Sequence, residues 1–560
     1  MTTLDYEAGE IIFREGEDGS STFVIVQGAV ELTRQGETGP IRLAVLGPGE
    51  PLGDVDDLGR RGATARAVEP VTLEAVGQES PPPKSSTFDR LIEMLSGDGA
   101  AKETPEPVPG QAAVEAPAGF LTRFFGGVPH AKRIDILVAN LMDEAGKNHA
   151  RHIAGALKGS RGIRARPFNK TMPPEVRRPE ERARLARGWL EAADADLLIW
   201  GEIPPPGTTL DLHFVSSKAD EEYRPGSFGP ATTLNLPVGF GPELTPLLLP
   251  VSLAATRPRT DAKGLRLVEV LPQALDMAMP IARNLPLDMT SGERAAVQSC
   301  FANALVTAAA FRNDPDLYQM AAQTYQEALA NLSLEETPEK WAFNQKNLGM
   351  VLLILAEGDN DTDTLDAAAE AFRAALKVLN KEEHPRHWAV AQNRLGMVLF
   401  KLDASIGDPE LLKHALTAFQ AALQVITKAE DPIPWAEIMG NFAQAAQVLG
   451  KQLRNPEVLE KAAEACRAAL EVRDRDEMPM AWAATQNNLG SALFLLGKLT
   501  GESDHLLGAA QAFERARDTY TGLGATRLAA ITEKNLAHVE PLLEARKKAP
   551  SLKRRKGRGT

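Results

Sequence analysis

The sequence predicts a multidomain fold: an N-terminal antiparallel β barrel or jelly roll, a small α/β domain and a C-terminal all-α superhelical solenoid of paired helices. Three observations support this prediction. Residues 1–97 contain short β-rich runs separated by turns that contain glycine. Residues 119–255 alternate strand and helix patterns. Residues 256–545 are helical in pattern and repeat one motif every 47 residues.

Composition limits the classes of function. A chain of 560 residues is too long for one hydrophobic core. Its net charge of −13 argues against a body that binds nucleic acid, because phosphate binding needs a basic surface. The two cysteines have no ligand-like spacing and fit a reducing compartment. No apolar run is long enough to cross a membrane and the N-terminus lacks a signal-peptide pattern, so we expect a cytoplasmic protein.

The first region carries a motif order that points to a family. The runs AGEIIFREGEDGSSTFVIVQGAVEL, LGPGEPLGD and RRGATARAVEPVTLEAV follow one another within residues 7–76. This order resembles the cyclic nucleotide-binding domain family. The resemblance implies that cyclic AMP or cyclic GMP is a regulatory ligand, and that its ribose and cyclic phosphate contact Gly53, Asp54, Arg61, Gly62, Ala63 and Thr64.

Two departures from the family pattern leave alternatives open. Asp54 stands where the family has a longer Glu, so the ribose contact is harder to reach. Asp56 and Asp57 lie in a shortened segment before Arg61, and their charges repel a phosphate. We therefore favour a retained barrel without affinity for cyclic nucleotides. The alternative is a working sensor in which Arg61 binds the phosphate.

Two segments connect this region to the repeat. Residues 98–118 are rich in Pro, Ala and Glu and lack aromatic residues, which is typical of a flexible linker. In residues 119–255, RIDILVANL, GIRARPF, ADLLIWGEI and TLDLHFVS read as strands. KNHARHIAGALKGS and EERARLARGWLEAA read as helices. The order βαβαββ predicts a small mixed sheet with helices packed on it.

The repeat in residues 256–545 is marked by tryptophan at equal intervals. Each interval is 47 residues, between Trp341, Trp388, Trp435 and Trp482. A leucine or phenylalanine followed by a small residue comes seven residues after each tryptophan, as in Leu348-Gly349. A second helix carries a ring or cysteine at Tyr325, Phe372, Phe419, Cys466 and Phe513. We expect the small residues to let the second helix approach closely, and stacking of neighbouring pairs to bury the apolar faces.

The pattern Leu-Gly with Ala-x3-Phe-x2-Ala-Leu resembles the tetratricopeptide (TPR) family, although 47 residues exceeds that family's period of about 34. The resemblance implies a concave groove, lined by the first helix of each pair, that binds a protein or peptide partner. The position before the Leu-Gly pair often faces this groove. It holds Asn347, Arg394, Asn441, Asn488 and Asn535. The alternative is that these side chains bond neighbouring helices inside the solenoid.

The sequence shows no motif of a catalytic or metal site. Gly146-Lys147 lacks the preceding glycine and following Ser/Thr of a phosphate-binding loop, and His149 and His152 have no third ligand nearby. The tail, residues 546–560, is basic and predicts a disordered end, with nucleic acid or an anionic membrane as alternative contacts. We therefore expect a non-enzymatic interaction scaffold. The alternative is a signalling receptor gated by a cyclic nucleotide.

Overall fold

The fold is that of a computed structural model, which describes residues 3–6, 8–14, 22–36, 39–46, 51–52, 64–68, 70–76, 133–141, 146–158, 162–218, 223–229, 232–359 and 361–548. The chain divides into two compact units. The first contains strands β1 to β8, and the second contains all elements from β9 to α16. Within the described ranges, no helix has the length and apolar character needed to cross a membrane.

The first unit consists of two four-stranded antiparallel sheets. One has the order β1-β8-β3-β6 and the other β2-β7-β4-β5. The strands are β1 (Thr3–Tyr6), β2 (Ile11–Phe13), β3 (Thr22–Gln27), β4 (Val30–Gly36), β5 (Gly39–Leu46), β6 (Pro51–Leu52), β7 (Thr64–Ala67) and β8 (Val71–Val76). Gly28 makes the turn between β3 and β4 with a φ of +90°, which favours glycine.

Both sheets contribute to one small core, because alternate side chains of each strand point to the same face. It comprises Phe13, Ile25, Val30, Leu52, Ala65, Ala67, Val71 and Leu73. The antiparallel β-rich region predicted for residues 1–97 is confirmed in this coarse form.

The second unit begins with a mixed five-stranded sheet of order β10-β9-β11-β12-β13. Strands β9 (Ile134–Asn140), β10 (Ile163–Thr171) and β11 (Leu197–Glu202) are parallel, and β12 (Thr209–Ser216) and β13 (Leu234–Pro237) extend the sheet in antiparallel fashion. Helices α2 (Gly146–Ala156) and α3 (Pro179–Ala192) connect the parallel strands. The predicted order βαβαββ is confirmed, and β13 is an additional strand.

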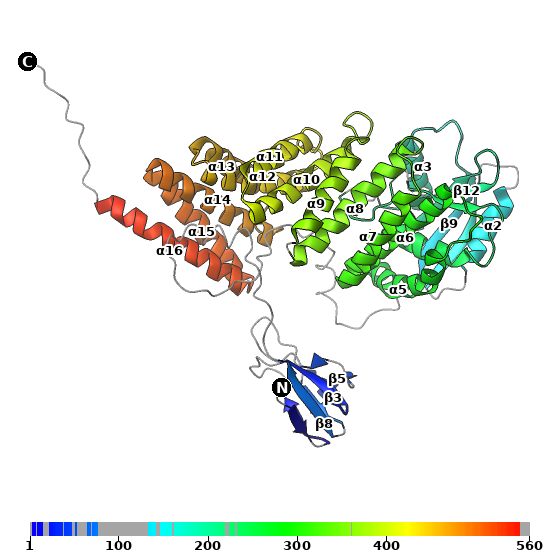
Figure 1. Cartoon of the computed structure of the whole chain (residues 1–560), viewed down its shortest axis with the longest axis horizontal. Helices are drawn as coiled ribbons and strands as arrows, with labels where there is room; N and C mark the ends of the chain where they lie inside the picture. The colour runs from blue at the N-terminus through cyan, green and yellow to red at the C-terminus, as the bar shows by residue number, and fades with distance from the viewer. Residues whose placement is uncertain are drawn as a thin grey trace, which may run out of the picture. The chain divides into compact units, whose positions relative to one another are not determined.

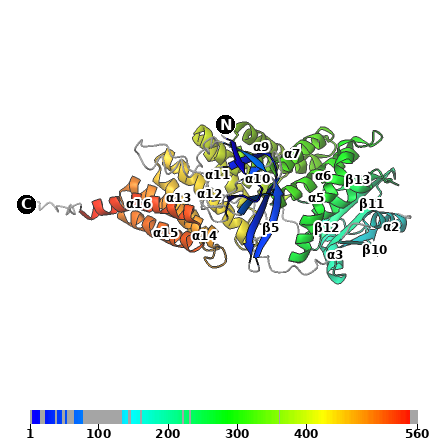
Figure 2. The ribbon, with the colours of Figure 1, turned by 90° about the horizontal axis from the view of Figure 1, so that it is seen from below.

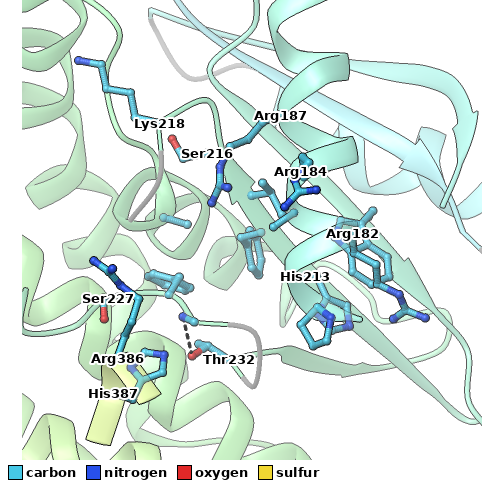
Figure 3. A pocket seen from close by; sticks show the side chains of 18 residues that line it. Arg182, Arg184, Arg187, His213, Ser216, Lys218, Ser227, Thr232, Arg386 and His387 are labelled. Atoms are coloured by element: carbon cyan, nitrogen blue, oxygen red, sulfur yellow. Dashed lines mark hydrogen bonds between the residues drawn. The ribbon is translucent and has the colours of Figure 1, made fainter. Parts of the chain in front are cut away.

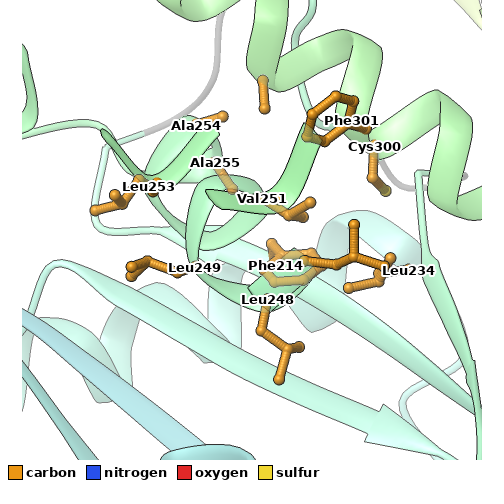
Figure 4. Close-up of a cluster of buried hydrophobic side chains, with 14 of the residues drawn as sticks. Phe214, Leu234, Leu248, Leu249, Val251, Leu253, Ala254, Ala255, Cys300 and Phe301 are labelled. Atoms are coloured by element: carbon orange, nitrogen blue, oxygen red, sulfur yellow. The ribbon is translucent and has the colours of Figure 1, made fainter. Parts of the chain in front are cut away.

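Helices cover both faces of this sheet. On one face, Phe214 of β12 lies in a large apolar cluster with α2, α4 (Leu248–Ala255), α5 (Asp261–Arg283) and α6 (Ser291–Arg312). Figure 4 shows Phe214 among side chains of α4 and α6. On the other face, Leu198 and Trp200 pack with α3. The sheet therefore shares one core with the first helices that follow it. Figure 2 shows α5 and α6 beside its strands.

The remaining helices follow one another in pairs (Figure 1). The first helices of the pairs, here named helices A, are α6, α8 (Pro338–Asp359), α10 (Pro385–Ile406), α12 (Pro432–Gln452), α14 (Pro479–Thr500) and the unpaired α16 (Thr526–Lys548). The second helices, named helices B, are α7 (Pro315–Ala330), α9 (Thr362–Ala375), α11 (Pro409–Ala422), α13 (Pro456–Leu470) and α15 (Ser503–Gly522). Each helix packs against the next along the chain, and α10, α12 and α14 also contact a neighbouring helix A.

The glycine of each helix A lies directly against an aromatic ring of helix B. A Cβ atom on this glycine would lie 3.0, 2.7 and 2.7 Å from the nearest ring atom in the pairs Gly349–Phe372, Gly396–Phe419 and Gly490–Phe513. Real Cβ atoms essentially never approach a ring to 2.7 Å, so a larger residue at Gly396 or Gly490 would force the ring to shift. The close approach of the two helices, predicted from the small residues, is confirmed in these pairs.

In the α12–α13 pair, other residues occupy the positions of the glycine and the aromatic ring. Ala443 occupies the glycine position, and Cys466 occupies the position of the ring. Both side chains are buried in one apolar cluster. In this pair, helix A carries the methyl group of Ala443 in place of a glycine hydrogen, and helix B carries the smaller Cys466 in place of a ring.

Two predictions concern residues largely outside the described ranges. These are the linker at 98–118 and the tail at 546–560. Helix α16 runs to Lys548, so the last helix ends three residues beyond the predicted boundary at 545.

Candidate functional site: a basic pocket

A pocket of about 470 Å³ lies between the sheet and helix α10 (Figure 3). Its walls come from α3, β11, the end of β12, residues 227–229 with Thr232, the end of α4 and the start of α10. Five cationic side chains line it: Arg182, Arg184, Arg187, Lys218 and Arg386. Figure 3 shows the arginines of α3 on one side of the pocket and Arg386 with His387 on another. No acidic residue belongs to the described lining.

Helix α3 carries three of the cations because of its amphipathic sequence. It begins with Pro179 at its first position, where a missing N–H has no cost. Ala186 and Leu190 are fully buried against the sheet. Arg184 and Arg187 are three residues apart and therefore lie close together on the helix surface. The buried apolar positions thus fix which way the arginines project.

A stack of three side chains forms one wall of the pocket. The ring of His213 lies parallel to that of Trp200, with centroids 4.1 Å apart and an angle of 5° between the planes. The guanidinium of Arg182 lies 5.0 Å from the Trp200 ring centroid, and its Nε donates a hydrogen bond to the carbonyl oxygen of Val176 at 2.6 Å. These contacts hold Arg182 in place.

The two histidines of the pocket are neutral at pH 7. Burial, and then the charges of Arg182 and Lys340, lower the pKa of His213 from 6.5 to about 3. Burial, and then the nearby charge of Lys346, hold the pKa of His387 well below 6.5. Lys346 Nζ lies 3.4 Å from His387 Nδ1. The positive charge of the pocket therefore comes from arginine and lysine.

Most of these cations are not neutralised by a neighbouring carboxylate. Arg386 is the exception, since its guanidinium forms a two-point pair with Asp431 at 2.8 and 3.0 Å. Arg184, Arg187 and Lys218 have no acidic partner among the residues that the structure describes. Such an arrangement attracts anions, because guanidinium and ammonium groups pair with phosphate and carboxylate oxygens.

The residues predicted to bind a cyclic nucleotide are mostly outside the described ranges. Gly53, Asp54, Arg61, Gly62 and Ala63 all fall there. Thr64 is described: it begins β7 and pairs with Thr33 of β4. The prediction for this site therefore stays a prediction.

Three of the five residues predicted to face a partner make hydrogen bonds to a neighbouring helix A. Asn347 donates a hydrogen bond to Asn303, Asn441 to Asn393 and Asn535 to Asn487, at 3.3, 3.3 and 3.2 Å. In each case the acceptor belongs to the preceding helix A.

Arg394 lies at the same repeat position and is also buried. Its guanidinium nitrogen is 3.7 Å from a carboxylate oxygen of Glu437. Asn488 is partly exposed. Asn347, Arg394, Asn441 and Asn535 thus contact a neighbouring helix A, as in the interhelical alternative. Contact of these five residues with a partner remains a prediction.

The pocket was not predicted from the sequence. Its clearest local signal is RARLAR within α3, which carries three arginines at helical spacing. That pattern is equally typical of a solvated helix face. Arg386 could not be assigned to the pocket from sequence, because α10 lies far from α3 along the chain. The two helices reach the same pocket only in the folded second unit.

Comparison with known proteins finds a family model that matches the first unit. Residues 3–80 match the model of the cyclic nucleotide-binding domain. The resemblance inferred from the motif order of residues 7–76 is thereby confirmed for the N-terminal region. No curated protein matches the chain.

Solved structures with similarity include the N-terminal domain of a transcriptional regulator from Streptomyces coelicolor A3(2), at 35% identity over 14% of this chain and 56% of that chain, with a TM-score of 0.13. The catabolite activator protein of Thermus thermophilus is 34% identical over 17% of this chain and 43% of its own, with a TM-score of 0.14. A cyclic nucleotide-binding-like protein from Brucella abortus is 26% identical over 16% and 75%, with a TM-score of 0.13. The chain spans about half the length of the first two.

Proposed function

We propose that this protein is a non-enzymatic regulatory scaffold, in which a TPR-like solenoid formed by the paired helices binds a protein or peptide partner. The observation that carries the proposal is the repeated contact between glycine of helix A and a ring of helix B. A contact that recurs at one repeat position supports stacking of equivalent pairs, and such stacking gives repeat proteins extended binding surfaces. The cyclic nucleotide-binding domain supports a regulatory role.

Exposed apolar side chains occupy the same repeat position in two neighbouring helices A, α12 and α14. Ile433 and Met480 both follow the first proline of a helix A and are 47 residues apart, with exposed fractions of 62% and 41%. Aliphatic side chains that recur on one surface are suited to a protein contact. We assign them to the partner-binding surface.

Capture of partners from the native cell tests this assignment. The double substitution Ile433→Asp/Met480→Asp should abolish recovery of partners that the unmodified chain retains. The matched control is Leu287→Asp, which changes an equally apolar residue with an exposed fraction of 95% in the loop before α6. Equal recovery by all three proteins would contradict partner binding at this surface.

A second candidate function is that of a receptor for a cyclic nucleotide, and the family match favours it. In this case Arg61 pairs with the cyclic phosphate. Calorimetric titration with cyclic AMP and cyclic GMP tests it. Binding that is lost on Arg61→Ala would establish the receptor. Absence of heat with either nucleotide would leave the domain as a retained fold without this ligand.

A further inference from the structure

We propose that the basic pocket binds a phosphorylated organic molecule of about the size of a nucleoside monophosphate. This inference is independent of the scaffold function and of the N-terminal domain, because every lining residue belongs to the second unit.

Charge is the first argument. Arg184, Arg187 and Lys218 carry positive charges without an acidic partner among the described residues. Among the same residues, the only hydrogen bond of the Arg182 guanidinium is to the carbonyl oxygen of Val176. Gathering like charges in one pocket is unfavourable unless an anion offsets their repulsion. A phosphate monoester carries nearly two negative charges at pH 7 and suits several cations at once.

Two buried donors without acceptors are the second argument. Arg187 Nε and Trp200 Nε1 are both buried, and neither has a hydrogen-bond acceptor among the residues described by the structure. Both residues line the pocket. A buried N–H without an acceptor costs about 1–3 kcal/mol, which a ligand oxygen would recover once binding opens either atom to the pocket.

The volume and the apolar part of the lining argue for an organic ligand. A cavity of about 470 Å³ lies within the range of small-molecule sites and is larger than inorganic phosphate requires. Phe214, Phe228 and Ala255 supply apolar surface, and the hydroxyl groups of Ser227 and Thr232 lie at the opposite wall from α3 (Figure 3). A phosphate bound to the α3 arginines would leave room for an attached group against this surface.

The distribution of charge favours a small molecule over a nucleic acid. The whole chain has a net charge of −13, so the cations of the pocket are a local concentration in an acidic body. A nucleic acid needs a long basic surface that follows its backbone. The pocket, which is lined by several elements of one unit, fits a single phosphate group and its substituent better.

Calorimetric titration of the full chain with AMP tests the proposal, with adenosine and inorganic phosphate as reference ligands. All proteins carry Arg61→Ala, so that the family-implied phosphate contact of the N-terminal domain does not contribute. We expect AMP to bind more tightly than phosphate, and adenosine to bind without measurable heat. Removing two charges by Arg184→Gln/Arg187→Gln should weaken AMP binding at least about tenfold, since each charge-assisted hydrogen bond contributes that much.

The matched control removes two exposed cations from the opposite face of the sheet, by Arg151→Gln/Lys158→Gln on and next to α2. It should leave AMP binding unchanged. Melting temperatures of both double variants establish that the fold persists. The proposal is overturned if AMP does not bind at millimolar concentration, if adenosine binds equally well, or if the two double variants bind AMP alike.

Discussion

Gly396 shows how a single residue position governs the packing of two helices. A Cβ atom there would lie 2.7 Å from the Phe419 ring, and the ring is fully buried. The ring therefore has little room to withdraw. In the next pair, Ala443 with Cys466 shows that a methyl group is tolerated when the side chain opposite is small.

Substitution of Gly396 by Ala should destabilise the second unit by about 1–3 kcal/mol, because overpacking outweighs the better helix propensity of alanine. Urea denaturation followed by circular dichroism measures it. Gly188→Ala in α3 is the control: its added Cβ meets no atom within 4 Å, so stability should rise slightly. The second change Phe419→Cys should restore part of the loss in Gly396→Ala; no recovery would contradict the packing argument.

His213 should make the protein sensitive to acid. Its pKa is about 3 in the folded state and 6.5 in an unfolded chain. Between these values the unfolded chain binds a proton that the folded chain does not. The free energy of unfolding therefore falls as the pH drops below 6.5, by up to about 1.4 kcal/mol per pH unit. Above pH 6.5 the residue has no effect.

Replacement by phenylalanine, His213→Phe, keeps a ring against Trp200 and removes the proton site. The urea midpoint should therefore fall less between pH 7 and pH 4.5 in the variant than in the unmodified chain. The buried His387 remains in both proteins and contributes equally. An identical fall in both would show that His213 does not titrate on unfolding.

Site residues were harder to predict than fold-determining residues. The glycine and ring positions are recognisable because they recur every 47 residues. Arg184, Lys218 and Arg386 do not recur, and only the packing of α10 beside the sheet brings them to one pocket. The asparagines of helix A were recognised as a set, but sequence did not decide between a partner and a neighbouring helix.

At the scale of elements, helix α5 is attached to the sheet by a buried ion pair. Lys263 Nζ lies 2.6 Å from Asp196 Oδ2, and the same oxygen accepts a hydrogen bond from the Asp135 amide at 2.9 Å. The Asp196 side chain is fully buried. Lys263 also lies 4.0 Å from Asp135, which Arg164 contacts in turn.

Lys263→Met should therefore destabilise the second unit by about 3–5 kcal/mol, because it leaves a buried carboxylate without its partner. Denaturant unfolding measures the loss. Adding Asp196→Asn to this variant should recover part of it, since the unpaired charge is removed. As a control, Arg259→Gln breaks a pair with the exposed Asp194 and should cost about 0–1 kcal/mol. A similar small loss for Lys263→Met would refute the structural role.

Most elements could be predicted because their sequence periods are regular. Strand β12 alternates buried and half-buried residues over its whole length, as a strand with one face on the core should. Strand β13 was missed because it has four residues and no such alternation, and it forms by pairing with β12. Helix α5 runs through Pro272 and Pro280, where local rules predict a break, because its apolar face packs on the sheet and α6.

At the scale of the whole molecule, each unit has a core of its own. The first is held by eight buried side chains from two sheets, and the second by clusters that run from the central sheet into the helices. Neither of these clusters contains residues of the other unit. Each unit should therefore fold without the other.

Deletion of residues 1–107 tests this expectation. The remaining chain should keep the calorimetric melting transition that the second unit shows in the full protein, within about 2 °C, since a change in melting temperature of that size corresponds to only about 2 kcal/mol for a unit of this length. Circular dichroism should show its helical spectrum unchanged. A markedly lower melting temperature, or loss of the helical signal, would mean that the second unit depends on the first.

The matched glycine and ring within each helix pair also bear on how such an array changes length over evolutionary time. Because Gly396 faces Phe419 whereas the next pair combines Ala443 with Cys466, a recombination point that joined one helix of each of these two pairs would place a methyl group against a ring or leave a void. Duplication or loss of a complete block of 47 residues keeps both members together. Relatives with longer or shorter arrays should therefore differ by whole blocks.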